Sequence, residues 1–249
     1  MQNTQWKNKR ACFLGDSITD GVGVKTGERY FDLLKNDFGM ETHGYGVNGA
    51  NSADVYQQAL KVYDTFGNDV DAVFVLIGTN DYNSSCPIGE WFTTHTESVV
   101  TEKNDNGEPV RKEERIVREF VFDDCTFKGR LNRLFAFLKK QYAEKTIVIM
   151  TPLHRAFAVF GRDNIQYNEL YANSIGKFIG DYVEAVREAA DIWSLSLIDL
   201  YRESGLFPLF EESAAAYFTN VDTDRLHPGK GGHERMARVI AAKLPTIAV

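Results

Sequence analysis

A serine, a histidine and an aspartate in this sequence have the types and surroundings that nucleophilic catalysis requires. Ser17 follows an apolar run by way of Gly15 and Asp16, so it stands where a buried strand gives way to a turn. A serine hydroxyl attacks a carbonyl carbon only when a base takes its proton, and the base needs a third group to hold its tautomer. His227 is the candidate base, and Asp224, three residues earlier, is the candidate third group.

His227 is chosen from five histidines because of its neighbours. We expect it in a polar loop just before the last helix, and Pro228 keeps that loop from becoming helical. His233 lies on the expected terminal helix, where a surface or packing role is the better interpretation. The remaining histidines are His154, which is considered below, and His43 and His95, which carry no catalytic signal.

Negative charge that develops on a substrate oxygen needs hydrogen-bond donors nearby. We expect three of them: the backbone N–H groups of Ser17 and Gly49, and the side-chain amide of Asn80. A glycine at position 49 also lets a substrate approach the backbone closely. Losing one such donor typically costs about 3 kcal/mol of transition-state stabilisation. The sequence therefore supplies a candidate oxyanion site beside the candidate nucleophile.

Two further places supply candidate substrate contacts. His154 and its neighbour Arg155 follow the end of an expected strand, and both contact with substrate and a purely structural role remain open for them. Asp16 is the other candidate, although bracing of the first loop by hydrogen bonds is its favoured interpretation.

Strand-like and helix-like segments alternate along the chain. Short apolar runs predict buried strands, and apolar residues at helical spacing predict amphipathic helices between them. This alternation is typical of a parallel sheet with helices on both faces, so we predict an α/β fold of three layers. The expected strands cover residues 11–14, 41–45, 72–77, 146–150 and 195–198, and the expected helices begin near residues 30, 52, 131, 181 and 232.

The three groups that would supply oxyanion donors each follow one of the first three expected strands. In an open parallel sheet, ligands bind beyond the carboxyl ends of the strands, near the point where the strand order reverses. We therefore expect the loops that carry Ser17, Gly49 and Asn80 to converge on one rim of the sheet.

A polar, charge-rich insertion occupies residues 82–128. Within it, Asn106-Gly107 predicts a β-hairpin between residues 98–102 and 110–115. We interpret this segment as part of a single domain that spans residues 1–249.

A second irregular segment covers residues 155–180. Its apolar residues suit a helix, but Gly176 and Gly180 oppose one. Because this segment and the first insertion both follow strand ends, we expect both to overhang the rim that carries the candidate site.

Composition narrows the classes of function. The formal net charge of -7 argues against a protein that binds nucleic acid. No window approaches the ~20 apolar residues of a membrane span, and residues 1–10 are polar, with no secretory signal. We therefore expect a cytoplasmic protein that binds a small molecule and no membrane, with a homo-oligomer as an open alternative. The three cysteines, Cys12, Cys86 and Cys125, are scattered along the chain, so we expect them to be free thiols. We expect neither a metal ion nor another cofactor.

Four blocks of this sequence, in this order, resemble those of the SGNH (GDSL-type) hydrolases. They run from residue 15 to residue 228, which is nearly the whole chain. Two positions depart from the family pattern: Ile18 stands where the family name has leucine, and Arg225 stands where a glycine is frequent. The blocks are Gly15-Asp16-Ser17, Gly49, Gly78-Thr79-Asn80-Asp81 and Asp224-Arg225-Leu226-His227-Pro228.

The resemblance implies a flavodoxin-like fold and ester hydrolysis through an acyl-serine intermediate. It makes Ser17 the nucleophile, His227 the base and Asp224 its partner, with Ser17, Gly49 and Asn80 as the oxyanion hole. The polar insertion favours short- to medium-chain acyl esters, with acetylated carbohydrates as one class. Alternatives are a lysophospholipase or thioesterase, an acyltransferase, and a module on the same rim that only binds a sugar or an anion.

Overall fold

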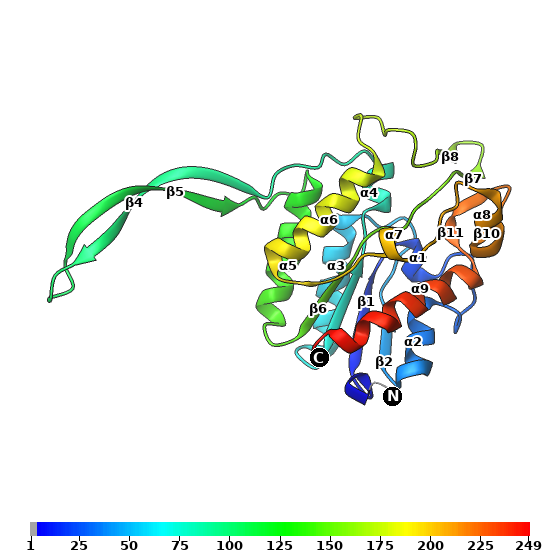
Figure 1. Ribbon diagram of the computed structural model, residues 1–249, viewed down its shortest axis with the longest axis horizontal. Coiled ribbons are helices and arrows are strands. Elements are labelled where there is room, and N and C mark those ends of the chain that lie inside the picture. The colour runs from blue at the N-terminus through cyan, green and yellow to red at the C-terminus, as the bar shows by residue number, and fades with distance from the viewer. Residues whose placement is uncertain (1–3) are drawn as a thin grey trace.

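The centre of the protein is a five-stranded parallel sheet with the strand order β2-β1-β3-β6-β9 (Figure 1). The structure is a computed structural model that describes residues 4–249, so residues 1–3 of the polar segment 1–10 lie outside the described residues. The strand order reverses between β1 and β3, as it does in flavodoxin-like sheets. The strands are β1 (Arg10–Gly15), β2 (Glu41–Gly44), β3 (Ala72–Leu76), β6 (Thr146–Met150) and β9 (Ser196–Ile198).

Helices cover both faces of this sheet, which confirms the predicted three-layer fold (Figure 1). One face packs against α3 (Ser52–Phe66), α5 (Phe127–Gln141) and α6 (Ile179–Trp193). The opposite face packs against α2 (Tyr30–Phe38) and α9 (Lys230–Lys243).

Strand β1 shows why the inner strands of the sheet are mostly apolar. Successive residues of a strand point to opposite faces of its sheet. Cys12 and Leu14 lie in the core beneath α3, α5 and α6, whereas Ala11 and Phe13 lie in the core beneath α2 and α9. Since both faces are covered, the positions from residue 11 to residue 15 are all buried, and an apolar residue is favoured there.

Several helix starts or caps differ from the sequence-based expectation, and α5 and α9 begin at Phe127 and Lys230 rather than near residues 131 and 232. Asn51, not Ser52, caps α3: its side chain accepts from the N–H of Ala53 at 2.9 Å. The Ser52 hydroxyl is engaged elsewhere, because it donates to the buried carboxylate of Asp81 at 2.6 Å. Helix α6 begins at Ile179, two residues before the predicted start, and Asp181 accepts from the N–H of Phe178 at 2.8 Å.

The predicted hairpin is much longer than expected and does not overhang the site. Strands β4 (Phe92–Lys103) and β5 (Pro109–Phe120) pair along their whole length and project sideways from the body (Figure 1). Only the base of this arm is anchored, where the ring of Phe120 stacks on Trp193 at 4.5 Å between centroids. The expectation that the first insertion overhangs this rim is therefore wrong for the β4–β5 arm, whereas residues 82–85, at the start of the insertion, line a cavity at the rim.

The second irregular segment forms strands rather than the helix that its apolar residues suggested. Strands β7 (Ala158–Gly161) and β8 (Asn164–Gln166) join a small sheet of order β10-β11-β7-β8. The polar loop expected around His227 is strand β11 (Asp224–Pro228), paired with β10 (Phe218–Asn220). β7 and β8 pair with each other as a short hairpin, as do β10 and β11, and the pairing of Asp224 with Ala158 joins the two. Local periodicity did not reveal these strands, because strand formation depends on the context in which a segment is paired.

Short elements complete the description. None of the helices in the described part of the chain is long and apolar enough to cross a bilayer. Cys12, Cys86 and Cys125 are free thiols. The short elements are η1 (Thr4–Trp6), α1 (Ser17–Asp20), α4 (Thr79–Asn83), α7 (Leu200–Glu203), α8 (Glu211–Tyr217) and η2 (Leu244–Thr246).

Candidate active site

Ser17, His227 and Asp224 form one hydrogen-bonded series at the carboxyl end of β1. The Oγ of Ser17 lies 2.9 Å from Nε2 of His227, and Nδ1 of His227 lies 2.9 Å from Oδ2 of Asp224. An ionised carboxylate only accepts hydrogen bonds, so Nδ1 carries the proton of the neutral ring. Nε2 is then the free acceptor that faces the serine hydroxyl. The series therefore has the protonation pattern that a general base requires.

The carboxylate of Asp224 is held in place by its own strand. Its Oδ1 accepts from the backbone N–H groups of Leu226 at 3.1 Å and His227 at 3.0 Å. Burial alone would raise the pKa of this carboxyl, but the hydrogen bonds from the side chain and backbone of His227 outweigh burial, so the net pKa is lowered. Asp224 is thus ionised at neutral pH and oriented toward the imidazole.

The small antiparallel sheet positions His227 beside Ser17. Asp224 pairs with Ala158 of β7, and the hydroxyl of Thr219 donates to the carbonyl of His227 at 2.9 Å. The ring of Phe160, also on β7, lies 5.3 Å from the imidazole between centroids. Strands from two distant segments of the chain therefore fix the height and direction of the imidazole above the main sheet.

Gln58 anchors the end of the strand that precedes Ser17. Its side-chain amide accepts from the N–H of Gly15 and donates to the carbonyl of the same residue, both at 2.8 Å. A Cβ on Gly15 would lie 2.3 Å from Oγ1 of Thr19 and 2.7 Å from the carbonyl oxygen of Leu76, so only glycine fits there. This bidentate clamp holds the backbone just before Ser17. Sequence reasoning missed Gln58, although a glutamine on the buried face of an amphipathic helix is a signal.

Asp16 braces the turn as expected. Its Oδ1 accepts from the N–H of Ile18 at 3.0 Å, and its side chain is buried. Burial raises the pKa of this carboxyl to about 6, against the lowering effect of the Ile18 hydrogen bond. Ser17 is the first residue of α1, so its N–H belongs to the donors at a helix N-terminus that have no partner within the helix. The N–H of Ser17 is therefore available to a ligand.

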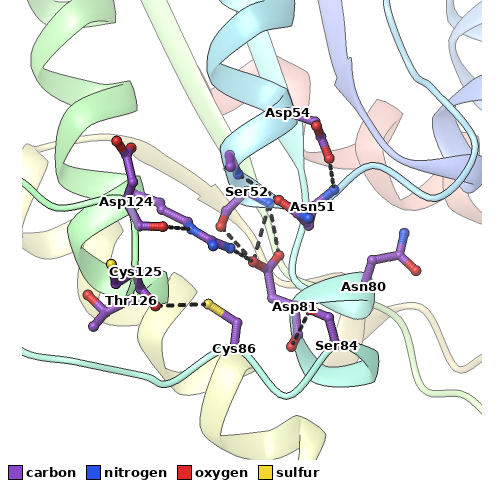
Figure 2. A network of polar contacts seen from close by, with 12 residues as sticks. Asn51, Ser52, Asp54, Asn80, Asp81, Ser84, Cys86, Asp124, Cys125 and Thr126 are labelled. Atoms are coloured by element: carbon purple, nitrogen blue, oxygen red, sulfur yellow. Dashed lines mark hydrogen bonds and ion pairs between the residues drawn. The ribbon is translucent and has the colours of Figure 1, made fainter.

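Asn80 sits on α4, which a buried polar network ties to α3. Asp81 accepts from the N–H and hydroxyl of Ser52 and pairs with Arg130 at 3.5 Å. Burial raises the pKa of Asp81 to about 6. Figure 2 shows Asp81 pointing into this network, whereas the side chain of Asn80 extends to the other side of α4. The Asp81 network thus fixes the helix, and Asn80 is left to face the site.

One pocket of about 270 Å³ brings the predicted residues together. Ser17, Gly49, Asn80 and His227 all line it, and Phe160 forms part of its wall. Gly49 has a φ of +81°, a conformation that favours glycine. The candidate nucleophile, the candidate base and the three candidate oxyanion donors therefore share one cavity.

A larger cavity of about 660 Å³ adjoins this pocket. The two share Asn164 and Gln166, which lie on β8. Both residues were missed by sequence reasoning, because nothing in the local pattern places this segment beside Ser17.

Among the described residues, no group of three or more His, Cys, Asp or Glu side chains is placed to hold a metal ion.

The other candidates lie outside the pocket lining. Nδ1 of His154 pairs with Glu169 at 2.7 Å, and its ring stacks on Tyr201 with 3.6 Å between centroids. His233 is fully buried, and its Nδ1 accepts from the N–H of Tyr30 at 3.2 Å. His233 thus has a packing role, and the contacts of His154 are structural.

The fold defines a three-layer α/β/α protein, and the series at its carboxyl edge gives it the chemical groups of a serine hydrolase. The chain belongs to the GDSL-like lipase/acylhydrolase family, whose model matches residues 13–235. Membership in this family makes the chain a hydrolase of the lipolytic GDSL class. Among curated proteins, none matches this chain.

Several solved structures share the fold over almost their whole length. A protein from Lactobacillus plantarum is 24% identical, with a TM-score of 0.70 and coverage of 96% of this chain and 98% of that chain. A possible lipase from Chitinophaga pinensis is 18% identical, with a TM-score of 0.67 and coverage of 95% and 98%. The lipase/acylhydrolase from Enterococcus faecalis is 16% identical, with a TM-score of 0.55 and coverage of 96% of each chain.

Proposed function

We propose that this protein hydrolyses short- to medium-chain acyl esters through an acyl-serine intermediate. The observation that carries the proposal is the series Ser17–His227–Asp224, with 2.9 Å at both side-chain hydrogen bonds, opening into a pocket that also holds Gly49 and Asn80. In such a series the serine attacks the carbonyl carbon, the histidine takes its proton, and the aspartate orients the histidine. The two hydrogen bonds support these three tasks for Ser17, His227 and Asp224.

The acylation step follows from these contacts. His227 Nε2 takes the proton of Ser17 Oγ while Oγ bonds to the ester carbonyl carbon, and the carbonyl electron pair moves to the oxygen. The N–H groups of Ser17 and Gly49 and the amide of Asn80 are the proposed donors to this oxyanion. When the tetrahedral species collapses, the bond from carbon to the alcohol oxygen breaks and the imidazolium returns its proton to the alcohol.

Deacylation repeats the sequence with water. His227 takes a proton from water as the water oxygen bonds to the acyl carbon, and the serine oxygen leaves with the proton that His227 returns. The acid and the free enzyme result. An alcohol in place of water would give acyl transfer, which is the alternative outcome of the same intermediate.

The cavities favour an ester with a small acyl group and an alcohol part that carries several hydroxyl groups. The pocket at Ser17 holds about 270 Å³, which suits a short chain. On one side its wall is made of amide side chains, Asn164 and Gln166, and these lead into the larger cavity of about 660 Å³. Amides pair with hydroxyl groups, so an acetylated carbohydrate is the substrate class that this wall supports best.

Labelling with a fluorophosphonate probe tests the nucleophile. Wild-type protein should be labelled at Ser17 and should turn over p-nitrophenyl acetate, whereas Ser17→Ala should show neither, while remaining folded by circular dichroism. Turnover by Ser17→Ala equal to that of the wild type would overturn the proposal. Unlabelled but folded wild-type protein would favour a module that only binds a sugar or an anion.

A substrate panel tests the acyl and alcohol preferences. We expect acetyl and butyryl esters to give higher kcat/KM than octanoyl or longer esters, and acetylated sugars to exceed simple alkyl acetates. An optimum at long acyl chains, or at lysophospholipid or thioester substrates, would contradict the short-chain assignment. Product analysis with added glycerol separates acyl transfer from hydrolysis.

A further inference from the structure

Arg155 is a buried cation whose guanidinium contacts neutral amide oxygens beside the site. It is 1% exposed. Its Nη1 donates to Oδ1 of Asn83, and its Nη2 donates to Oε1 of Gln166 and to the carbonyl of Tyr167, both at 3.1 Å. Burial lowers the pKa of the guanidinium to about 10, so it stays charged at neutral pH. The nearby carboxylates of Glu169 and Asp224 offset part of the cost of burying this cation, but its guanidinium donates to the neutral oxygens of Asn83, Gln166 and Tyr167.

A guanidinium carries only donors, so it dictates how an amide beside it is turned. Arg155 therefore holds Asn83 with its oxygen toward the cation and its NH₂ group away from it. That NH₂ group donates to Oδ1 of Asn80 at 3.3 Å and to Oε1 of Gln166 at 2.8 Å. Asn80 and Asn83 lie three residues apart on α4, which places them on the same face of the helix.

The orientation of Asn80 follows from this bond. With Oδ1 accepting from Asn83, Nδ2 is turned the other way, where it donates to the carbonyl of Ala50 at 2.9 Å. An amide NH₂ group has two hydrogens, and only one is used by Ala50. The other is left for a ligand in the pocket that Asn80 lines.

We propose that Arg155 and Asn83 are positioning residues that turn the amide of Asn80 so that its NH₂ group faces the substrate oxygen. This proposal rests on the proposed function, because it deepens the oxyanion role of Asn80 given there. An amide free to rotate would present its oxygen to the oxyanion part of the time, and that orientation repels the developing charge. The relay Arg155–Asn83–Asn80 removes this orientation before the substrate arrives.

Asn83→Asp is the sharpest variant. The carboxylate keeps the acceptor toward Arg155, and gives the buried cation an ionic partner, so the protein should fold. It has no donor for Asn80, however, and places an acceptor against Oδ1 of that residue. We expect kcat on p-nitrophenyl acetate to fall roughly 10-fold or more with little change in KM, since an oxyanion donor acts mainly in the transition state. Asn83→Leu, which is uncharged and of similar size, should likewise lower kcat with little change in KM.

A double-mutant cycle with Asn80→Ala separates positioning from a general effect. Asn80→Ala alone should lower kcat by roughly 10²- to 10³-fold. If Asn83 acts through Asn80, Asn83→Asp should change kcat by less than about twofold in the Asn80→Ala background. A direct effect of the new carboxylate on the oxyanion, or a loose helix α4, would lower kcat by the same factor in both backgrounds and would overturn the relay.

Arg155→Lys supplies the second arm. Lysine keeps the charge but lacks the planar fork that contacts Asn83 and Gln166 together, so kcat should fall while the fold is retained. Wild-type kcat in Asn83→Asp and Asn83→Leu would overturn the relay, whereas full activity of Ser17→Ala would instead overturn the proposed function. The two failures are therefore distinguishable.

Discussion

Oγ of Ser17 and Nε2 of His227 lie 2.9 Å apart although 210 residues separate them in the sequence. The two residues lie on different elements of the fold. Ser17 begins a four-residue helix at the end of β1, while His227 lies on β11, which pairs with β10 and β7. The contact therefore depends on how the small antiparallel sheet is set on the carboxyl rim of the parallel sheet.

Asp224→Asn should disable the base without unfolding the protein. An asparagine amide at this place can donate to Nδ1, which favours the tautomer whose Nε2 carries the proton and cannot accept from Ser17. We expect kcat for p-nitrophenyl acetate to fall by roughly 10³- to 10⁴-fold. Asp222→Asn, two residues away on the exposed side of the turn, is the matched control and should retain activity. Equal activity of the two variants would refute the role of Asp224.

Gln58→Leu should weaken both stability and catalysis. It leaves the buried N–H and carbonyl of Gly15 without their side-chain partner, which should lower the free energy of unfolding by roughly 2–4 kcal/mol. The end of β1 then moves more freely, so kcat should also fall. Urea unfolding and steady-state kinetics provide the measurements. Gln57→Leu, on the exposed side of the same helix, should change neither, and a comparable loss there would contradict the clamp.

Shortening the β4–β5 arm should leave catalysis intact. Thr94 pairs with Arg118, so a two-residue Asn-Gly turn that replaces residues 95–117 can close the hairpin in register while keeping its base at Phe92 and Phe120. Beyond that base the arm extends away from the body of the protein (Figure 1), so kcat/KM on p-nitrophenyl acetate should stay within about twofold of the wild type. A folded, inactive variant would show that the arm takes part in substrate turnover.

His233 should make stability depend on pH. Burial, with a smaller contribution from the nearby charge of Arg29, lowers the pKa of His233 to about 4, from 6.5 in the unfolded chain. Between these values the unfolded state binds the proton and the folded state does not, so stability falls as the pH drops from 6.5 toward 4. The resulting decrease in the free energy of unfolding is about 3 kcal/mol.

Denaturant unfolding of wild type and His233→Asn across that pH range measures the contribution. The asparagine oxygen can take the place of Nδ1 as acceptor for the N–H of Tyr30 but does not titrate. The difference between the two proteins should shrink or reverse on acidification. Parallel stability curves would show that His233 does not carry the effect.

Much of the scaffold could be read from local patterns. The segment 146–150 is a strand at the predicted residues, and Tyr30–Phe38 is a helix that ends at Gly39, whose φ is +65°. A run of apolar residues indicates a strand buried on both faces, and apolar residues at helical spacing indicate a helix buried on one face. These elements therefore follow from short stretches of sequence. The placement of Ser17, Gly49 and Asn80 at strand ends followed in the same way, and the chemical roles given to them stay predictions.

Tertiary structure decided what local patterns do not contain. The anchoring of the β4–β5 arm on Trp193, the pairing of β7 with β11, and the clamp of Gln58 on Gly15 all depend on contacts between segments far apart in the chain. The same holds for Arg155, which the sequence left open between substrate contact and structure. Its partners Asn83 and Gln166 come from two different segments, and only their packing shows that it contacts the amides beside the candidate site.

The sequence by itself determined the layers, the strand ends and the kinds of residue at the rim, because strand and helix periodicity depend on near neighbours. The distances and orientations at the rim were decided by tertiary structure, because they require the register of the small sheet and the hydrogen bonds that cross between loops. The serine, histidine and aspartate were recognisable by type and order. That the serine hydroxyl faces the imidazole, and that the Asn80 amide is turned toward the pocket, follows from the folded chain alone.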